Sequence, residues 1–488
     1  RRGIGDGVMI EGLNLIDGQW VPSSSGATFE RRNPADHDDV IGVFPDSTEA
    51  DVDAAVSALA KVAPQWAATP PERRAAILEA AAAHLEARAG ELVDELVREE
   101  GKTRAEATME VGRTPMNLRF YAGEALRTTG STYPTPGEGL VITLREPVGI
   151  VGAITPWNFP LNIPSRKLGP ALAAGNVVVF KPSELTPLMG QRLVEALLAG
   201  GLPAGALALV QGSGRAGGAV AADERVDAVT FTGSTQVGRA IHAAVGPSRR
   251  SQLEMGGKNP VVVLGDADVD KAAALIVKGA FGLSGQACTG TSRVIAVDEI
   301  HDRLLDRVVE LAEGITVGPG AEPGVGMGAL ASKAQLAKFL EYVQIGRDEG
   351  AELVCGGASL DRGNGYFAAP TVFAGGSPDM RVVTDEVFGP LLVFLRASGF
   401  DDAVALANDT EFGLSAGIVT NDVTKALAFA GRSESGLVKI NQPTTGMSMN
   451  APFGGYKASS TQTHKEQAGD SMMQFYQAEK TVYLSPSA

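Results

Sequence analysis

The spacing of apolar residues along the chain predicts two successive series of alternating strands and helices. In the first series, four short continuous apolar runs have the pattern of buried strands: 148–155, 176–182, 207–212 and 228–233. Helical periods that separate some of these runs begin at Pro187 and Thr235. This alternation is typical of a parallel sheet covered by helices.

The second series extends from Pro260 to about Phe429. Its apolar runs VVVLG, SRVIAV, LLVFLR and AGIVT predict further buried strands. Its helical runs are Asp268–Phe281, Ile300–Gly314, Ser332–Glu349 and Asp401–Asn408. We therefore expect an α/β protein with a second strand–helix unit after the first.

Other patterns flank these two series. Residues 13–45 alternate short apolar runs with turn residues, which is typical of hairpins. A helix start at Thr69–Glu72 leads into a 3.6-residue apolar period over 75–98, and a further helical stretch covers 103–126. Residues 128–147 are rich in Thr, Gly and Pro and then β-like, and the tail 472–484 is again β-like. We interpret 128–147 as an excursion from the first unit.

Composition narrows the function classes. A chain of 488 residues has room for two to four domains. Its net charge of −15 disfavours a nucleic-acid partner, because phosphate binding needs a basic face. We expect no membrane association, because the most apolar stretches, such as Leu168–Phe180, are short and interrupted by Gly, Pro or Asn. Arg1 and Arg2 lack a following apolar segment, so no signal peptide is expected, and Met9 offers a native start after an irregular extension.

Cysteine and histidine usage points away from disulfides and metals. Cys288 and Cys355 are the only two cysteines, which favours a reducing, cytoplasmic setting. The five histidines are scattered without metal-ligand spacing, so no metal site is expected. Cys355 follows a strand pattern and is interpreted as structural.

Cys288 is the strongest candidate for chemistry. It lies in FGLSGQACTGTSR (281–293), just after Gly285 and between a helical and a strand-like run. A thiol in such a loop is accessible to a substrate, whereas the alternative is an inert buried thiol.

Two further motifs provide groups that could assist a thiol. TPWNFP places Asn158 between two aromatic residues and two prolines, so its side-chain amide is a fixed donor for a developing oxyanion. LEMGGK places Glu254 at a strand end before two glycines, where partial burial would make it a general base. The alternatives are a turn asparagine and a surface carboxylate.

Two strand ends have the features of a dinucleotide site. FTGSTQVG combines a strand, a Gly233-Ser234 turn and a helix start, where backbone N–H groups can hold a pyrophosphate. KPSE places Lys181 and Glu184 after a strand, where the glutamate can bind ribose hydroxyls and repel a 2′-phosphate. The alternative for FTGSTQVG is an ordinary turn between a strand and a helix, and the alternative for KPSE, which is favoured when the motif is taken alone, is a solvated strand end.

Together these groups fit the oxidation of an aldehyde. The thiolate adds to the carbonyl, hydride transfer to nicotinamide leaves a thioester, and water activated by the carboxylate hydrolyses it.

The motifs PWNFP, KPSE, FTGSTQVG, LEMGGKNP, GQAC, EVFGP and PFGGYK, in this order, resemble the aldehyde dehydrogenase superfamily over about residues 14–484. The resemblance implies that Cys288 is the nucleophile, Glu254 the general base and Asn158 the oxyanion donor. It implies NAD as cofactor, with NADP as the alternative. The implied cofactor-binding residues are Ile154, Thr155, Pro156, Trp157, Lys181, Ser183, Glu184, Gly214, Phe231, Gly233, Ser234, Met255, Glu386 and Phe388.

The resemblance also implies a domain organisation. A Rossmann-type dinucleotide-binding domain would comprise 9–127 and 148–256, and a catalytic α/β domain 257–470. A small β arm, 128–147 with 471–488, would mediate a homodimer or homotetramer. One departure is the segment ASSTQTHKEQ after PFGGYK, where many members carry glycines; it puts in doubt the proton-relay role that the resemblance suggests for Glu466.

The substrate expectation depends on Arg166. Segments 117–127, 252–260 and 448–460 look similar to the α-ketoglutarate semialdehyde dehydrogenase branch. Arg166 follows Asn158 by eight residues, which would place both on one face if the stretch is helical. An arginine there suits a carboxylate, with Phe159 and Phe453 as further substrate contacts; the alternative is a structural ion pair. Gly282 stands where the succinic semialdehyde branch often has an arginine.

Three hypotheses about the function therefore remain open. The first is oxidation of a carboxylated semialdehyde, above all α-ketoglutarate semialdehyde. The second is oxidation of succinic semialdehyde or of a neutral, aromatic or betaine-type aldehyde. The third is a non-catalytic protein on the same fold.

Overall fold

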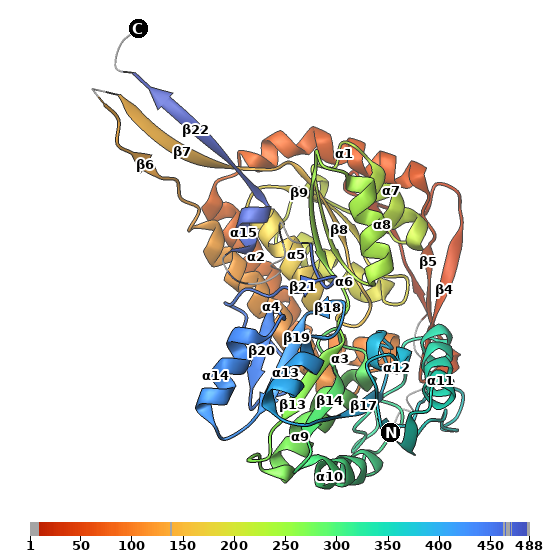
Figure 1. The fold of residues 1–488 in the computed structure, drawn as a ribbon. Coiled ribbons are helices and arrows are strands. Elements are labelled where there is room, and N and C mark those ends of the chain that lie inside the picture. Colours follow the sequence, from red (N-terminus) through yellow and green to blue (C-terminus); the bar gives the residue numbers. More distant parts are fainter. Residues whose placement is uncertain (1–8, 137–138, 462–463, 465–468, 470, 486–488) are drawn as a thin grey trace.

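The first large sheet forms the core of the N-terminal half of the protein. The structure is a computed structural model that describes residues 9–136, 139–461, 464, 469 and 471–485 (Figure 1). The sheet has the strand order β12-β11-β8-β9-β10-β2-β3, and its five strands from β12 to β10 are parallel. The strands are β2 Asn14–Ile16, β3 Gln19–Val21, β8 Ile150–Ile154, β9 Val177–Lys181, β10 Leu207–Leu209, β11 Ala228–Thr232 and β12 Arg250–Glu254.

Helices cover both faces of this sheet, which explains why its strands are continuous apolar runs. Right-handed crossovers place α5 and α6 on one face and α7 and α8 on the other, as Figure 1 shows. The N-terminal helices complete the cover: α1 packs on the sheet beside α7, whereas α2, α3 and α4 pack over α5 and α6. The helices are α1 Glu49–Ala67, α2 Pro71–Ala87, α3 Ala89–Glu100, α4 Arg104–Ala125, α5 Asn162–Ala173, α6 Pro187–Ala199, α7 Gly214–Ala222 and α8 Thr235–Val245, with a 3₁₀ turn, η1 Ala204–Ala206.

The second large sheet has the order β15-β16-β17-β14-β13-β19-β20 and is parallel except for its edge strand β15. Its strands are β13 Asn259–Val263, β14 Thr291–Val297, β15 Glu352–Cys355, β16 Thr371–Ala374, β17 Leu391–Ala397, β19 Ser415–Val419 and β20 Leu437–Ile440. The surrounding helices are α9 Val269–Phe281, η2 Gly282–Gly285, α10 His301–Glu313, α11 Lys333–Asp348, α12 Arg381–Thr384, α13 Phe400–Asn408 and α14 Val423–Arg432.

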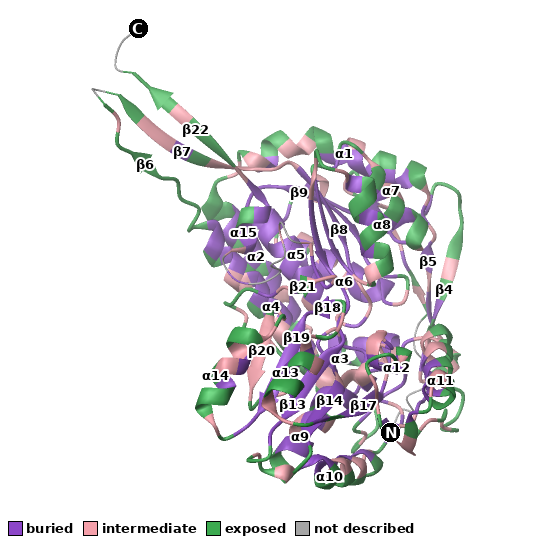
Figure 2. Cartoon of the chain, in the orientation of Figure 1, coloured by how far each residue is buried: buried purple, intermediate pink, exposed green. Residues whose placement is uncertain are grey.

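Each sheet has its own hydrophobic core, and the expected α/β class is confirmed. Purple buried strands fill the centre of each half in Figure 2, whereas the outer helix faces are exposed. Two small sheets lie beside them: β1 Ile10–Glu11, β4 Thr28–Asn33 and β5 Asp36–Pro45 form one, and β18 Phe412–Gly413 and β21 Tyr456–Lys457 form the other.

A three-stranded arm projects from the body of the molecule (Figure 1). It pairs β7, Leu140–Pro147, with β6, Thr132–Tyr133, and with β22, Gln477–Leu484, all antiparallel. The strand β22 therefore brings the end of the chain back to the excursion after α4. The two segments that the sequence assigned to an arm thus lie side by side.

Two predicted element boundaries are wrong. The apolar period over 75–98 is not one helix, because α2 ends at Ala87 and α3 starts at Ala89, with Arg88 out of helical geometry at φ −108°. The tail is not β-like from residue 472, because Met472–Phe475 form a helical turn, α15. The apolar residues of this turn pack into the first hydrophobic core, and their burial favours the helical turn over strand pairing. In the described part of the chain, no helix is long and apolar enough to cross a membrane.

A buried arginine fixes α13 to the second sheet. Arg293 on β14 is 1% exposed, and its Nη1 and Nη2 donate to the carbonyl oxygens of Leu406 (3.0 Å) and Ala407 (2.9 Å). Its Nε donates to the carbonyl of Lys258 at 3.0 Å. These carbonyls include the free groups at the end of α13, which a helix cannot satisfy internally.

We expect Arg293→Met to lower the free energy of unfolding by roughly 3 kcal/mol, because it leaves buried carbonyl groups without donors. The midpoint of urea unfolding, followed by circular dichroism, measures this change. The control is Arg215→Met, which removes an exposed arginine paired with Glu49 and should shift the midpoint little. Equal shifts in the two variants would contradict the role given to Arg293.

Candidate active site

The loop that carries Cys288 has a strained and closely held backbone. Leu283 and Ser284 have positive φ angles of 53° and 55°, which non-glycine residues rarely adopt. At Gly285, a Cβ atom would lie 2.1 Å from the carbonyl oxygen of Gly389. The loop is held by the Ser284 hydroxyl, which donates to the carbonyl of Gly328 at 3.0 Å. The conformation is therefore fixed by its surroundings, as is common at functional sites.

Cys288 is half-buried and lies against the small apolar cluster of Leu414 and Phe453. Burial, with a contribution from the negative charges of Glu386 and Glu254, raises the pKa of its thiol to about 12. The nearby Arg166 guanidinium opposes this rise. Without a further positive charge or a base, Cys288 is thus a neutral thiol at pH 7.

The Asn158 side chain reaches the cysteine loop from the opposite domain. It follows the end of β8, is 2% exposed, and its Nδ2 donates to the carbonyl oxygen of Gln286 at 2.9 Å. Trp157 beside it meets Phe388 edge to face, with ring centroids 5.5 Å apart. The amide predicted to hold an oxyanion is therefore anchored to Gln286, which lies two residues before Cys288 in the cysteine loop.

Glu254 lies at the end of β12, as the sequence predicted, and is 2% exposed. Its Oε1 accepts a hydrogen bond from the Ser460 hydroxyl at 3.0 Å. Its negative charge acts on the Cys288 thiol, which places the two groups in one site. A buried carboxylate close to a thiol can accept a proton from water in the same cavity.

The turn after β11 forms an open helix N-terminus. Ser234 caps α8, and its hydroxyl accepts a hydrogen bond from the backbone of Val237. A Cβ at Gly233 would lie 2.4 Å from Phe231 Cζ, and one at Gly238 would lie 2.4 Å from Met255 Sδ. Small residues thus keep Phe231 and Met255 close beneath the turn, and the exposed N–H groups suit an anion.

The strand end of β9 carries the predicted ribose contacts. Lys181 is 4% exposed, and its Nζ lies 3.3 Å from Glu184 Oε2. The Glu184 side chain is 46% exposed, so its carboxylate lies at the surface of the protein. The hydroxyl of Ser183 accepts a hydrogen bond from the backbone of Leu185 at 3.2 Å, which shapes the turn between them.

Other residues of the predicted cofactor group lie at the end of β8, in the loop that follows it and at the start of α7. Ile154 and Thr155 end β8 and continue it, and the Thr155 backbone donates to the carbonyl of Lys181 at 3.2 Å. In the described residues the buried Thr155 hydroxyl has no hydrogen-bond partner, so it is available to a ligand. Pro156 is half-buried in the following loop, and Gly214 begins α7.

Glu386 and Phe388 lie in the loop between α12 and β17, beside the second sheet. The Glu386 carboxylate accepts a hydrogen bond from the backbone of Gly257 at 3.1 Å, and Phe388 has a positive φ of 59°. A Cβ at Gly256 would lie 2.1 Å from Glu386 Oε2, so only glycine leaves room for this carboxylate. The pair faces a narrow cavity that it shares with Gly285 and Thr291.

Arg166 reaches the site, although the predicted reason is wrong. Helix α5 starts at Asn162, so Asn158 lies in the preceding loop and the two residues do not share a helix face. The Arg166 guanidinium is buried, lies 5.9 Å from the centroid of Phe453 and contacts Met447 Sδ through Nη1. Within the described chain its Nε has no hydrogen-bond partner and no carboxylate lies within 4.0 Å of it.

A second arginine lies next to it. Arg113 on α4 donates from Nη2 to the carbonyl oxygen of Met447 at 2.8 Å, and its charge lowers the pKa of Arg166 in addition to burial. Two guanidinium groups therefore meet at Met447. The ring of Phe159, the other predicted substrate contact, lies 4.9 Å from Lys102 Nζ.

Several buried polar residues at this junction were not recognised in the sequence. Asn259 donates from Nδ2 to the carbonyl oxygens of Cys288 and Gly290, both at 2.8 Å, and so fixes the cysteine loop. Lys167 donates to the Thr230 hydroxyl at 2.8 Å, and burial lowers its pKa to about 7 despite the nearby Glu254. Asn259 lies inside the LEMGGKNP motif and Lys167 follows Arg166, so both could have been found from their neighbours.

Glu466, for which the resemblance suggests a proton-relay role, lies outside the described residues.

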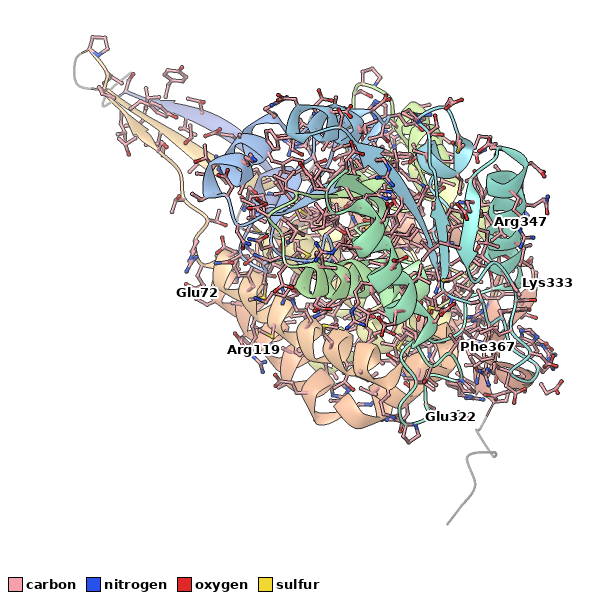
Figure 3. All side chains as sticks on the ribbon, turned by 60° about the horizontal axis from the view of Figure 1, so that its bottom comes forward. Glu72, Arg119, Glu322, Lys333, Arg347 and Phe367 are labelled. Carbon is pink, nitrogen blue, oxygen red and sulfur yellow. The ribbon has the colours of Figure 1, made fainter. Side chains whose placement is uncertain are left out.

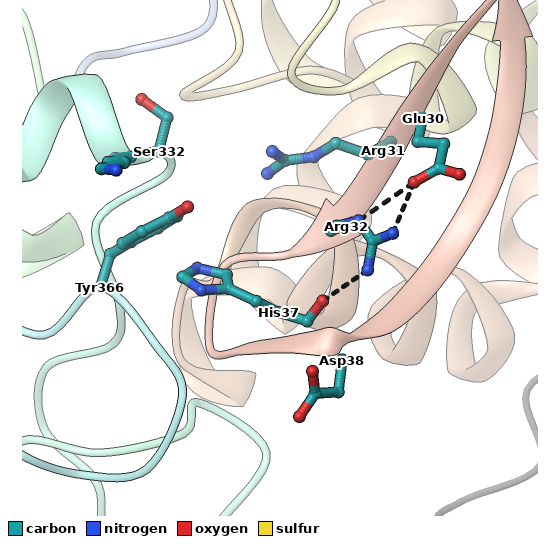
Figure 4. Close-up of a pocket in the computed structure, with 8 residues that line it drawn as sticks. Glu30, Arg31, Arg32, His37, Asp38, Ser332 and Tyr366 are labelled. Atoms are coloured by element: carbon teal, nitrogen blue, oxygen red, sulfur yellow. Dashed lines mark hydrogen bonds and ion pairs between the residues drawn. The ribbon is translucent and has the colours of Figure 1, made fainter.

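A separate polar hollow, lined by Arg31, His37, Ser332 and Tyr366 among others, lies between the β4–β5 hairpin and the start of α11 (Figure 4). No predicted site residue lines this hollow. Among the residues that the structure describes, no group of three or more His, Cys, Asp or Glu could hold a metal ion.

Similarity to known proteins agrees with this arrangement. Residues 20–482 match the Aldehyde dehydrogenase family. The chain is 41% identical to the alpha-ketoglutaric semialdehyde dehydrogenase of Bacillus subtilis, over 97% of this chain and 98% of that protein. It is 42% identical to the 2,5-dioxopentanoate dehydrogenase of Saccharolobus solfataricus, over 95% of this chain and 98% of that protein.

A solved structure is similarly close. The NAD-dependent aldehyde dehydrogenase of Sinorhizobium meliloti superposes with a TM-score of 0.95 at 36% identity, over 99% of this chain and 96% of that one. The match extends over both sheets and the arm. The chain therefore belongs to the aldehyde dehydrogenase family.

Proposed function

We propose that this protein oxidises a carboxylated semialdehyde, above all α-ketoglutarate semialdehyde (2,5-dioxopentanoate), to the carboxylic acid with NAD. The observation that carries the substrate is the buried Arg166, which has no carboxylate within 4.0 Å among the described residues and whose charge acts on Cys288. A buried charge without a counter-ion is costly, and a substrate carboxylate would compensate it. The names of the two relatives support the same substrate class.

The chain supplies the groups for each step of the reaction. The Cys288 thiol gives up its proton to water, and Sγ then forms a bond to the aldehyde carbon while the C=O π bond breaks. The oxygen becomes an oxyanion held by the Asn158 amide and the Cys288 backbone N–H. The bound cofactor supplies the acceptor for the hydride that leaves this carbon. A thioester on Cys288 remains, and Glu254 takes a proton from the water that hydrolyses it. The products are the carboxylic acid and the free thiol.

The crevice fits a dinucleotide at each of its parts. The free N–H groups at the α8 N-terminus after Gly233 and Ser234 would hold the pyrophosphate. Lys181 and Glu184 would bind the adenosine ribose, and the Glu386 carboxylate the ribose next to the nicotinamide. The exposed Glu184 carboxylate favours NAD over NADP, because it would repel a 2′-phosphate.

The positive charge of an oxidised nicotinamide would also change Cys288. Burial and two carboxylates hold the thiol pKa at about 12, and a cation nearby stabilises the thiolate. The site is therefore arranged so that its nucleophile becomes reactive when the cofactor is present.

The arm supports assembly into a homodimer or homotetramer. Strand β22 leaves Tyr483 at 79% and Leu484 at 55% exposure, and exposed strand edges readily pair with another chain. Both cysteines are free thiols, which supports a reducing, cytoplasmic setting.

The second candidate is succinic semialdehyde, which also carries a carboxylate. Succinic semialdehyde is shorter than α-ketoglutarate semialdehyde. The branch that oxidises it often has an arginine where this chain has Gly282, at the start of η2. A betaine-type aldehyde is disfavoured, because two guanidinium groups would repel its cation. A non-catalytic role is disfavoured by the convergence of Cys288, Glu254 and Asn158.

Arg166→Met tests the substrate class. We expect kcat/KM to fall about 10–100-fold for α-ketoglutarate semialdehyde and succinic semialdehyde, because a charged hydrogen bond is lost. Propanal and benzaldehyde should be nearly unaffected. NADH absorbance measures all four rates.

A control variant separates this effect from a general one. Arg119→Met removes an arginine of α4 that pairs with Glu79 and Glu86 on the outside of the protein (Figure 3). It should leave all four substrates unchanged. If the wild-type enzyme prefers propanal or benzaldehyde, the carboxylate role of Arg166 is wrong, although the oxidation chemistry would stand.

Glu254→Gln tests the hydrolytic step. The variant should release about one NADH per active site in a first burst and then turn over about 10²–10⁴-fold more slowly, because the thioester persists. Stopped-flow absorbance at 340 nm measures both phases. Cys288→Ser, which cannot form the thioester, should show neither phase. Full steady-state activity in Glu254→Gln would refute its role as the base.

Glu184→Ser tests cofactor choice. Removing the carboxylate should weaken NAD and admit NADP, and we expect the ratio of their kcat/KM values to change roughly tenfold. The control is Glu72→Ser, which removes an exposed carboxylate from the start of α2 (Figure 3). An unchanged ratio in Glu184→Ser would mean that another group discriminates against the 2′-phosphate.

A further inference from the structure

We propose that the buried pair of Lys102 and Glu110 positions Asn158 for catalysis. Neither residue is among the groups assigned to the reaction above, and the inference rests on the proposed role of the Asn158 amide. Both side chains are at most 1% exposed; Lys102 lies just before α4, and Glu110 lies in its second turn. They act as positioning residues, because they touch the loop of Asn158 rather than the reacting atoms.

Lys102 holds the backbone of Asn158 itself. Its Nζ donates to the carbonyl oxygen of Asn158 at 2.7 Å and to Glu110 Oε2 at 2.6 Å. It also lies 4.9 Å from the centroid of the Phe159 ring. A buried ammonium group with three donors is thus directed at one peptide of the TPWNFP loop, which limits the rotation of Asn158.

Glu110 holds the other end of the same loop. Its Oε1 accepts hydrogen bonds from the backbone N–H groups of Leu161 (2.9 Å) and Asn162 (3.1 Å). These are among the free N–H groups at the start of α5, where a negative charge is favourable. The ion pair therefore fixes residues 158 and 162 relative to each other, with the Asn158 side chain between them and the cysteine loop.

The same helix also holds the cysteine loop. Glu106, one turn before Glu110, accepts a hydrogen bond from the backbone of Leu283 at 2.6 Å. Leu283 begins the left-handed stretch that precedes Cys288. Two carboxylates four residues apart on α4 thus contact the two loops whose relative position decides whether the Asn158 amide reaches the oxyanion.

Removing one partner alone would leave a buried charge unpaired and could unfold the protein. The double variant Lys102→Met/Glu110→Gln avoids this problem, because it removes one charge of each sign and keeps an amide oxygen for the N–H groups of Leu161 and Asn162. The second carboxyl group beside Lys102, that of Glu100 at 3.8 Å, has a pKa raised to about 8 by burial and is therefore protonated at pH 7 when Lys102 is absent. The double variant loses the donor to the Asn158 carbonyl. The double variant is compared with Asn158→Ala. A variant that carries all three substitutions completes the mutant cycle.

We expect Asn158→Ala to lower kcat about 10²–10³-fold, as for other oxyanion donors, and the double variant to lower it about tenfold or more. The combined variant should be no slower than Asn158→Ala alone, because the pair acts only through Asn158. NAD affinity, measured by quenching of protein fluorescence, should change less than about twofold in all three.

The matched control is Glu95→Gln, which breaks a half-buried ion pair with Arg192 in the first domain. It should lower the urea midpoint without changing kcat. If the decreases in kcat multiply in the combined variant, the pair acts independently of Asn158 and the inference is wrong. If Asn158→Ala itself keeps full kcat, the oxyanion role in the proposed function fails, and this inference fails with it.

Discussion

The parallel pairing of β8 with β11 is the constraint on which the rest of the site depends. The two strands are neighbours in the sheet, but β9 and β10 come between them in the sequence. The crossovers to either side run over opposite faces, so the loops after β8 and β11 separate and leave a crevice at their carboxyl ends. Asn158 follows one of these strands and Gly233 the other. Strand order thus determines where the proposed cofactor site lies.

Charge decides what this crevice can do. The chain buries Arg166 without a carboxylate nearby in the described part, and it buries Cys288 beside two carboxylates. Each arrangement is unfavourable in isolation. A substrate carboxylate would compensate the first, and the cation of an oxidised nicotinamide would compensate the second. The proposed site would therefore be complementary in charge to its two ligands taken together, and less so to either alone.

The sequence predicted the parts of the site that lie at strand ends, because a buried strand followed by Gly, Asn or a charged residue is visible locally. Glu254 at the end of β12 and the turn after β11 are examples. It could not predict contacts between distant segments. Lys102 reaches the carbonyl of Asn158 across 56 residues, and Asn259 reaches Cys288 across 29.

The argument for Arg166 shows a different limit. A spacing of eight implies a shared face only when both residues are helical, and α5 starts four residues after Asn158. Arg166 comes close to Cys288 because the loop before α5 turns back over the cysteine loop. Tertiary packing thus produced the proximity that the helical period was wrongly expected to explain.

The two roles of α4 follow from its place between the domains. Its body packs against α2 and α5 in the first domain, whereas Glu106 contacts Leu283 of the second. Chemistry at Cys288 requires groups from both domains, so some element must set their relative position to within a fraction of an ångström. A helix is suited to this task because its carboxylates four residues apart point the same way. Substrate selection at Arg166 is separate from this contact. If Arg166 binds the substrate as proposed, the substrate could therefore change through Arg166 while Glu106 and Glu110 of α4 and the loops that they hold stay unchanged.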